Sequence, residues 1–589
     1  MSTFLLRSAE TMKNIKNLFP FLKPYQKLLI IGPIFKLLEA ISELFLPFLM
    51  SKIIDIGVAK NDKPYIITMG IVMIAIAVLG VVFALICQYS ASLVSQGVGT
   101  DIRNTLFRHI GTLTNKDLDY IGVPTLINRI TGDVNQIQLA VAMLIRLVIR
   151  APFLCIGGLI MAFVLDIKLS LILVLALPIF VLILFLTMTK TIPLYKTVQK
   201  NLDRIALVLR ENLSGIRVIR GFAKSEFERE RFSAANEEYR ENVTKVGKIS
   251  ALLNPLTSLI MNFAIGGIIW FGGVRVSSGN LTTGSVIAFM GYVTQILASL
   301  IVISNLVVIF TKAYASSVRV AEVFETKPSM TEGTEEIPVG ETSPYVIEFR
   351  DVSMSYKEGG NYNIKNISFG IKQGETIGII GGTGSGKSTV VQLIPRFYET
   401  TEGEVLLYGK NVKDYSTKAL RKKIGMVPQK AVLFTGTIAS NLRMGKEDAS
   451  LEEMKEAADI AMASEFIEKL PAGFDSPINR GGVNVSGGQR QRLTIARALV
   501  GNTDILILDD SFNALDYATD KNLRMALKDK RKDMTTIIVS QRAGTLQSAD
   551  RIIVLNEGEI AGIGTHNELV NECDIYQEIC HSQGIIAKA

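Results

Sequence analysis

A glycine-rich segment in the second half of the chain has the residue types needed to hold the phosphates of a nucleotide. It fits the pattern G-x-x-x-x-G-K-[ST] and reads Gly381, Gly382, Thr383, Gly384, Ser385, Gly386, Lys387, Ser388, followed by Thr389. The apolar run Thr376–Ile380 directly precedes it, which predicts a strand, a loop and then a helix. Glycines let backbone N–H groups wrap phosphates at a helix N-terminus. We expect Lys387 to reach the β- and γ-phosphates of ATP and Ser388 to bind Mg²⁺.

A second segment supplies an acidic partner for such a site. Ile505–Asp509 is an apolar run that ends in a carboxylate, which is typical of a buried parallel strand. Asp509 is expected to hold Mg²⁺ through water. Apolar strands that end in Asp are common, so this signal gains its weight from the phosphate loop. Together the two segments predict ATP and Mg²⁺ as cofactors.

A third motif lies between them and reads Val485, Ser486, Gly487, Gly488, Gln489. A serine and two glycine amides at a helix start suit an anion. With this motif the chain resembles the ABC transporters of the exporter type, in which six membrane helices are fused to one nucleotide-binding domain. The resemblance covers essentially the whole chain. It implies that the third motif, the signature, caps the γ-phosphate of ATP bound to an opposite domain, so that two domains enclose two nucleotides.

The resemblance assigns further residues one by one. It implies that Tyr356 stacks on adenine and that Gln429 contacts Mg²⁺ together with Ser388. It also implies that Asp516 belongs to a loop that borders the nucleotide. That loop carries Asn513 where the family usually has serine.

Two positions depart from the family at the catalytic end of the site. The family places a glutamate after the Asp509 position, and this chain has Asp510; the family's switch histidine is replaced by Gln541. A general base must come within about 2.6–3.2 Å of its water, and Asp510 is one methylene shorter. Gln541 can donate a hydrogen bond but cannot gain a proton at neutral pH. We therefore expect good ATP binding and weak hydrolysis, as in the degenerate-site subunit of heterodimeric bacterial ABC multidrug exporters.

The composition indicates a membrane protein. Of 589 residues 48% are hydrophobic and only 20% are charged, and the mean hydropathy is +0.32. This excludes disordered, collagen-like and coiled-coil chains. We attribute the net charge of +8 to cytoplasmic loops and expect no nucleic-acid partner. The four cysteines form no C-x-x-C pair, which indicates neither a disulfide framework nor a zinc site.

Six apolar stretches are long enough to span a bilayer, which needs about 20 residues. They lie at residues 26–52, 65–90, 141–164, 169–190, 250–273 and 286–310. The two long connections between spans are rich in Arg and Lys, which places them, both termini and the nucleotide-binding domain on the cytoplasmic side of the cell membrane. The predicted organisation is an interfacial helix at 1–25, a transmembrane domain at 26–318, a linker at 319–344 and an α/β P-loop nucleotide-binding domain at 345–584.

Two groups of membrane-half residues stand out. By resemblance, Glu211–Ile219 is the second coupling-helix region, and Arg129–Val134 follows the first coupling helix. In the first span Lys36, Glu39 and Glu43 share one helical face. They line a substrate cavity, or Lys36 and Glu39 simply neutralise one another.

The sequence therefore predicts ATP-driven export of lipophilic or cationic compounds of the multidrug type. The expected partners are a second ABC half-transporter, the lipid bilayer, and a small lipophilic, cationic or peptide substrate. A peptide or lipid exporter is one alternative, and a largely regulatory ATP-binding membrane subunit is another.

Overall fold

The computed structural model describes residues 18–337, 343–357, 359–501 and 503–585. The chain divides into two compact units. The first unit takes the chain up to Gly111 and then Val123–Thr326, and the second takes Thr112–Gly122 and the chain from Lys327 onward. The first unit contains most of the predicted transmembrane domain, and the second contains the predicted nucleotide-binding domain. The two are described one at a time.

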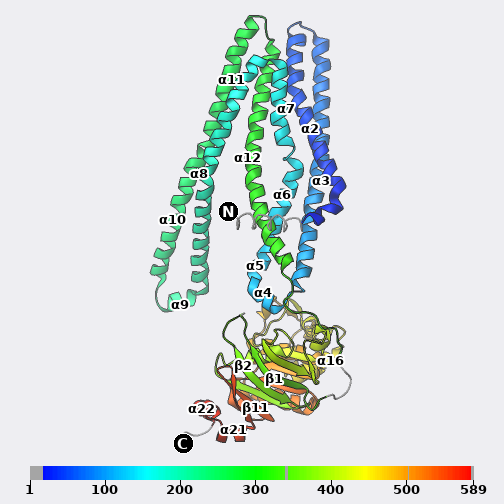
Figure 1. Ribbon diagram of the computed structural model, residues 1–589, viewed down its shortest axis with the longest axis vertical. Helices are drawn as coiled ribbons and strands as arrows, with labels where there is room; N and C mark the ends of the chain where they lie inside the picture. Colours follow the sequence, from blue (N-terminus) through cyan, green and yellow to red (C-terminus); the bar gives the residue numbers. More distant parts are fainter. Residues whose placement is uncertain (1–17, 338–342, 358, 502, 586–589) are drawn as a thin grey trace. The chain divides into compact units, whose positions relative to one another are not determined.

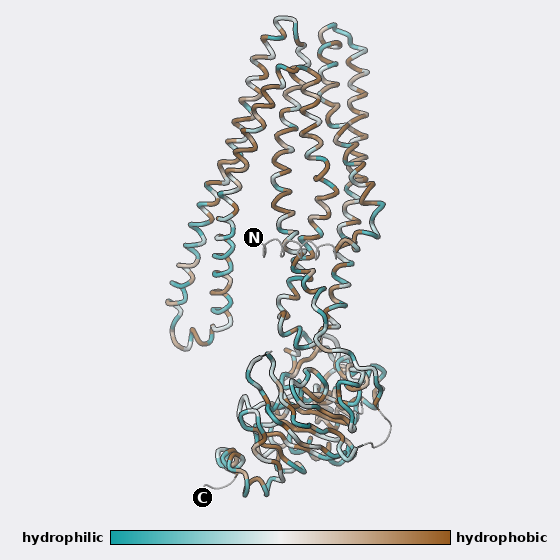
Figure 2. The backbone as a smooth tube through the Cα atoms, viewed as in Figure 1, coloured by the Kyte–Doolittle hydropathy of each residue, from teal (hydrophilic) through white to brown (hydrophobic). Residues whose placement is uncertain are grey.

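The first unit is helical. Its main helices are α2 (Gln26–Lys52), α3 (Lys63–Ile110), α6 (Val134–Arg146), α7 (Arg150–Leu165), α8 (Ile167–Ser214), α10 (Ser225–Ala251), α11 (Leu253–Ser277) and α12 (Thr283–Glu325). Long α8 and α10 run side by side and are joined at one end by the short helix α9 (Ile216–Gly221) (Figure 1). Hydrophobic residues dominate the first part of α8 and give way to hydrophilic ones toward α9, while α10 is largely hydrophilic (Figure 2). Glu211–Ile219, the predicted second coupling-helix region, lies at this end.

All six predicted spans lie in helices, but two of the spans are interrupted. The third is broken between α6 and α7, and the fifth is broken at Leu252 between α10 and α11. Pro152 and Pro255 follow these breaks within a few residues. A proline has no N–H for the carbonyl four residues earlier, and its ring clashes with that carbonyl. Hydropathy alone does not reveal such breaks.

Within the part of the chain that the structure describes, five helical stretches are long and apolar enough to cross a membrane: Lys63–Ile110, Val123–Leu165, Ile167–Ser214, Ser225–Ser277 and Thr283–Glu325. Helix α2 is not among them, because Lys36, Glu39 and Glu43 interrupt its apolar sequence. Charged groups in such a helix are costly unless they find partners. Their partners are described with the site below.

The two ends of the predicted membrane domain differ in detail from expectation. Most of the predicted interfacial helix lies outside the described residues, and Phe19–Tyr25 forms a 3₁₀ helix that contains Pro20 and Pro24. At the other end α12 continues to Glu325. The predicted linker at 319–344 therefore begins as helix, because Val320 and Val323 still bury their apolar side chains.

Among the described residues, the second unit contains two large sheets and a two-stranded one, in which β7 (Gly436–Thr437) pairs with β8 (Pro477–Ile478). The six-stranded sheet has the order β12-β11-β3-β10-β9-β6, in which only β12 is antiparallel to its neighbour. Its strands are β3 (Thr376–Gly381), β6 (Ile424–Val427), β9 (Ile505–Asp509), β10 (Thr535–Val539), β11 (Arg551–Asn556) and β12 (Glu559–Gly564). Every residue of β9 and β10 is buried. This is the predicted α/β architecture, and it brings the carboxyl ends of β3, β9 and β10 to one edge, where α/β sheets bind ligands.

The second sheet is antiparallel, with the order β2-β1-β4-β5. Its strands are β1 (Ile347–Met354), β2 (Ile364–Ile371), β4 (Glu402–Leu407) and β5 (Lys410–Asn411). The helices that matter for the site are α13 (Lys387–Leu393), α18 (Gly487–Val500), α19 (Tyr517–Lys530), α20 (Ala543–Leu546) and α22 (Asp574–Ser582).

One short helix from the first half of the chain belongs to the second unit. Helix α4 (Asn115–Ile121) starts with a capping box between Thr114 and Asp117. The Asp117 carboxylate also accepts a hydrogen bond from the backbone N–H of Ser329, at 3.1 Å. Burial raises the pKa of Asp117, but the hydrogen bonds from Thr114 and Ser329 outweigh burial and hold this pKa below its usual value. Its charge thus fastens α4 to the segment that follows α12.

Candidate nucleotide-binding site

The glycine-rich segment forms a loop between the end of β3 and the start of α13. Gly384 has φ 83° and Gly386 has φ 94°, a left-handed conformation that glycine adopts readily. A Cβ atom at Gly386 would lie 2.5 Å from Cγ2 of Ile364. The loop can therefore keep its close path beside β2 only with glycine at this position. The predicted strand, loop and helix are all present.

Lys387 lies inside this loop. Its Nζ donates hydrogen bonds to the carbonyl oxygens of Gly381, at 2.9 Å, and Gly382, at 2.6 Å. Only 8% of its surface is exposed. Burial lowers the pKa of Lys387, and the nearby carboxylates Asp510 and Asp509 oppose that effect. The ammonium group is held by the loop itself and can turn toward a phosphate.

Of the three residues predicted to bind magnesium, Ser388 and Asp509 contact each other, while Gln429 donates to the neighbouring Asp510. Ser388 Oγ donates a hydrogen bond of 3.1 Å to Oδ1 of Asp509. Burial raises the pKa of the Asp509 carboxyl, Asp510 adds to this, and the hydrogen bond from Ser388 and the charge of Lys387 oppose it. Hydroxyl and carboxylate oxygens are the ligands that Mg²⁺ prefers, usually together with substrate phosphates. The pair fits a magnesium ion.

Asp510 occupies the turn directly after β9 and is held from three sides. Its backbone has φ 50°, and its N–H donates to the carbonyl oxygen of Val539 at 3.0 Å. Asn513 Nδ2 donates to Asp510 Oδ1 at 2.6 Å, and Gln429 Nε2 donates to Oδ2 at 3.3 Å. Both carboxylate oxygens are thus engaged with amides. The short side chain is also a fixed one.

These residues border one cavity of about 270 Å³. It is lined by Asn363, Thr383, Gly384, Gly386, Lys387, Ser388, Thr389, Gln429, Asp509, Asp510, Val539 and Gln541. Both positions that depart from the family, Asp510 and Gln541, therefore face the same space as Lys387 and Ser388. Gly381, Gly382 and Ser385 belong to the loop but do not line this cavity.

The signature residues lie apart from that cavity. Ser486 caps α18: its Oγ accepts from the N–H of Gln489 at 3.2 Å, and its own N–H donates to Gln489 Oε1 at 2.9 Å. Ser486 and Gly487 are exposed, and no Cβ at Gly487 would meet another atom within 4 Å. The start of α18 is therefore open to an external group.

Asp516, which was predicted to border the nucleotide, caps a helix. Its carboxylate caps α19 by accepting from the N–H of Thr519 at 2.9 Å and from the Thr519 hydroxyl at 2.8 Å. The structure places Asp516 outside the lining of the cavity and gives it a helix-capping role.

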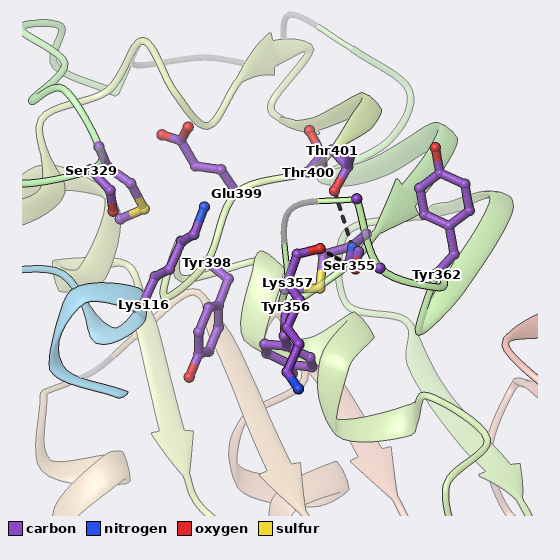
Figure 3. A pocket seen from close by; sticks show the side chains of 14 residues that line it. Lys116, Ser329, Ser355, Tyr356, Lys357, Tyr362, Tyr398, Glu399, Thr400 and Thr401 are labelled. Carbon is purple, nitrogen blue, oxygen red and sulfur yellow. Dashed lines mark hydrogen bonds between the residues drawn. The ribbon is translucent and has the colours of Figure 1, made fainter. Parts of the chain in front are cut away.

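Tyr356 lies in a neighbouring cavity of about 300 Å³, where Lys116, Tyr398 and Glu399 are also found (Figure 3). Its hydroxyl is 3.2 Å from Oγ1 of Thr389, which follows Ser388 in the phosphate loop. The Tyr398 ring meets the Tyr356 ring edge-on at 4.9 Å. Burial raises the pKa of both tyrosines. The aromatic ring predicted for adenine is thus fixed against the phosphate loop.

Sequence reasoning missed several residues around the site. Tyr398 donates a hydrogen bond of 2.6 Å to Oδ2 of Asp119 in α4, so α4 reaches the Tyr356 ring through one side chain. Asn363 lines the phosphate cavity from the loop before β2. Gln583, near the end of the chain, contacts the segment that carries Gln541. The contact between Asn513 and Asp510 was also not predicted. It has a sequence signal, since Asn513 stands where the family usually has serine.

The charged residues of α2 pair with one another and with α7. Lys36 Nζ lies 2.7 Å from Glu39 Oε2, and Arg150 lies 2.7 Å from Glu43 and 3.9 Å from Glu39. Arg146 donates to Ser92 Oγ at 3.3 Å. The neutralisation of Lys36 by Glu39 is present, and Arg150 extends it into a four-residue network.

Comparison with known proteins places both units. Residues 29–300 match the ABC transporter transmembrane region, and residues 364–513 match the ABC transporter family. An uncharacterized ABC transporter ATP-binding protein of Bacillus subtilis is 38% identical over 564 residues, which is 96% of this chain and 97% of the relative. An ATP-dependent lipid A-core flippase of Pasteurella multocida is 30% identical over 579 residues, or 98% of this chain and 99% of the relative.

The fold has a close counterpart among solved structures. A bacterial Atm1-family ABC exporter with ATP bound matches 96% of this chain and 99% of its own, with a TM-score of 0.77 and 24% sequence identity. At that identity the likeness shows the fold, a helical exporter transmembrane domain with a P-loop nucleotide-binding domain, and confirms the predicted fold class. The relatives cover the same two regions along nearly their whole length. The chain therefore belongs to the ABC transporters, as an exporter half-transporter in which a transmembrane domain is fused to an ABC ATPase domain.

Proposed function

We propose that this chain is one half of a heterodimeric ABC exporter of the cytoplasmic membrane, and that its own ATP site hydrolyses slowly. The observation that carries the proposal is the turn after β9. Asp510 replaces the usual glutamate, and Asn513 and Gln429 hold both of its oxygens. A general base works only within hydrogen-bond reach of its water, and a well-placed one contributes about 10²–10⁴ in rate. A shorter carboxylate that is already hydrogen-bonded gives up much of this factor.

The binding half of the same site supports tight retention of MgATP. Backbone N–H groups at the start of α13 and the ammonium of Lys387 receive the phosphates. Ser388 and Asp509 would hold Mg²⁺, which would neutralise charge on the phosphates. Tyr356 offers a ring for the base. These groups orient the nucleotide without taking part in proton transfer.

The signature supports the need for a partner. Ser486 and the first N–H groups of α18 are exposed and lie outside this chain's own nucleotide cavity. A helix N-terminus favours a negative group, and in the ABC family that group is the γ-phosphate of ATP on the opposite domain. This chain then provides an intact signature to a partner whose general base is complete. Fast hydrolysis occurs there.

The exported compounds are lipophilic or cationic molecules of the multidrug type. The apolar helices and the near-neutral pairing of Lys36, Glu39, Glu43 and Arg150 support a cavity that selects weakly by charge. A lipid exporter is the second candidate, and it is favoured by relatives that are named lipid A-core flippases. Arg and Lys in the α8–α10 connection support a cytoplasmic position for the nucleotide-binding domain, because such residues are enriched in cytoplasmic loops.

The test is co-purification with a candidate partner. A tagged copy of this chain is expressed with a half-transporter that has a glutamate after its own Walker B aspartate, and ATPase and drug transport are measured in proteoliposomes. We expect a one-to-one complex that hydrolyses ATP at least ten times faster than this chain alone. Formation of only homodimers with full transport activity contradicts the proposal.

A further inference from the structure

A glutamine near the end of the chain holds the backbone that carries Gln541. Gln583 Nε2 donates a hydrogen bond of 2.7 Å to the carbonyl oxygen of Gln541. Gln583 Oε1 accepts a hydrogen bond of 2.8 Å from the N–H of Ala543, the first residue of α20. One side-chain amide therefore bridges two backbone groups on either side of Arg542.

The rest of this segment is also fixed. The N–H of Ser540 donates to the carbonyl oxygen of Ile379 in β3 at 3.1 Å. The N–H of Arg542 donates to Ser540 Oγ at 3.0 Å. Gln583 adds the two bonds that restrain the far side of Gln541. The backbone of this position is thus held from the sheet on one side and from the chain end on the other.

Gln583 has a firm base. It follows α22, whose Tyr576 and Cys580 are fully buried. The Tyr576 hydroxyl lies 2.8 Å from Nδ1 of His566. After α22 the chain turns at Gly584, with φ 68°, and the N–H of Ile585 donates to the carbonyl oxygen of Cys580 at 3.0 Å. Gln583 is therefore attached to a buried helix and can restrain the exposed backbone at Gln541.

The orientation of the Gln541 side chain depends on its backbone, because the side chain itself has few restraints. Its side chain lines the phosphate cavity with Lys387 and Asp510. Within the described residues, no hydrogen bond restrains the Gln541 side-chain amide. The direction of that amide then depends on the backbone that Gln583 holds.

We propose that Gln583 is a positioning residue that aims the Gln541 amide at the γ-phosphate and so sets the preference of this site for ATP over ADP. The inference rests on the proposed function and on the expectation that Gln541, which stands in place of the family's switch histidine and lines the phosphate cavity, faces the γ-phosphate. Gln583 itself touches neither nucleotide nor Mg²⁺. Its effect reaches the ligand only through the backbone of Gln541.

The experiment measures ATP and ADP binding to the full-length chain in lipid nanodiscs, by displacement of a fluorescent ATP analogue in the presence of Mg²⁺. Gln583→Ala removes both bonds. Gln583→Glu keeps the acceptor for the N–H of Ala543 but has no donor for the carbonyl of Gln541. Gln577→Ala is the matched control, since Gln577 lies on α22 and its side-chain amide makes no hydrogen bond within the described residues.

One hydrogen bond of ordinary strength, such as that from the Gln541 amide to a phosphate oxygen, corresponds to about a 3- to 10-fold change in an equilibrium. We expect Gln583→Ala and Gln583→Glu to lower the ratio of ADP to ATP dissociation constants by about that factor, with ADP affinity unchanged. Gln577→Ala should leave the ratio intact. In the Gln541→Ala background, Gln583→Ala should have no further effect on the ratio, because the two residues act in series.

Three results overturn the inference in different ways. If Gln541→Ala lowers the ratio and both Gln583 variants keep it, Gln583 does not position Gln541. If the Gln583 variants weaken ATP and ADP binding equally and lower the thermal unfolding midpoint, the role of Gln583 is structural only. If Gln541→Ala itself leaves the ratio unchanged, the assignment of Gln541 to the γ-phosphate is wrong, and with it that part of the proposed function.

Discussion

The phosphate loop and the turn after β9 border the same cavity, yet they differ in how much of the ABC pattern they retain. The loop keeps every residue of its motif, and Lys387 and Ser388 are held by the loop carbonyls and by Asp509. The turn keeps only the charge of the usual glutamate, on a shorter side chain that is bound to two amides. The difference teaches that binding a nucleotide and activating a water can be separated within one cavity.

The residues at the carboxyl ends of the strands also differ in burial. Asp509, the last residue of β9, is 2% exposed, whereas Asn513 in the turn after β9 and Gln541 after β10 are exposed. A buried, parallel-strand end tolerates few substitutions, because each change leaves a cavity or an unpaired polar group. An exposed turn can lose its catalytic group without loss of the fold.

The largest expected effect comes from the signature. Ser486→Phe in the complex with an unmodified partner should reduce ATP turnover by about 10²-fold or more, because it removes donors aimed at the charge that develops at the fast site. ATPase measured in proteoliposomes checks this. Ser582→Phe, which changes the exposed last residue of α22, is the control for bulk alone. An active Ser486→Phe complex means that the signature of this chain does not serve the fast site.

A smaller effect is expected at the phosphate loop. Lys387→Ala removes a charged hydrogen-bond donor worth about 1.5–3 kcal/mol, so ATP affinity at this site should fall about 10- to 100-fold. Turnover of the complex should fall by less, since the fast site keeps its chemistry. Binding is measured with a fluorescent ATP analogue. If Lys387→Ala abolished ATP turnover as completely as Ser486→Phe does, both sites would be required for hydrolysis, which contradicts the assignment of fast hydrolysis to the partner's site.

The charged residues of α2 test whether substrate transport and ATP hydrolysis depend on different parts of the molecule. Glu39→Gln or Glu43→Gln leaves the charge of Arg150 less compensated, so transport of cationic compounds should fall several-fold while basal ATPase stays nearly constant. Glu238→Gln, in the exposed pair with Arg204, is the control. If both variants transport every tested cation normally and only unfold at lower temperature, the network is structural.

The smallest expected effect is one on stability. The pKa of Asp509 is raised mainly by burial, so its charged form destabilises the fold above that pKa, and this cost disappears as the pH falls through it. Asp509→Asn should therefore raise the thermal unfolding midpoint of the nucleotide-free chain by a few degrees at pH 8 and by less at about pH 4, near the ordinary pKa of an aspartate. It should also weaken MgATP binding. Scanning calorimetry at both pH values decides, and equal shifts at both contradict the assigned cause.

Local motifs made the phosphate loop and the β9 carboxylate predictable, because their residues are neighbours in sequence. The meeting of Ser388 with Asp509 followed from strand order, since parallel strands end at one edge. The bond between Tyr398 and Asp119 joins residues 279 positions apart, and that between Gln583 and Gln541 joins residues 42 apart. Neither leaves a periodic or local pattern, so only the folded chain reveals them.

The membrane half gives the same lesson at a coarser scale. Apolar runs predict six spans, and among the described residues five helical stretches are long and apolar enough to cross a membrane. The breaks beside Pro152 and Pro255 depend on a single missing N–H each. The sequence predicts that the transmembrane domain ends at residue 318, whereas α12 continues to Glu325. The acidic residues after the helix are evident in the sequence, but the burial of Val320 and Val323 is evident only in the fold.

The central claim is that the turn after β9 is what slows hydrolysis, and the most direct measurement is the ATPase rate of the full chain without a partner. The signature of this chain is intact, so two copies can supply every other part of a site. We expect wild-type and Asp510→Asn chains to hydrolyse ATP equally slowly. The double variant Asp510→Glu with Gln541→His should be faster by about 10²-fold. Rapid hydrolysis by the wild type that Asp510→Asn abolishes would contradict the account.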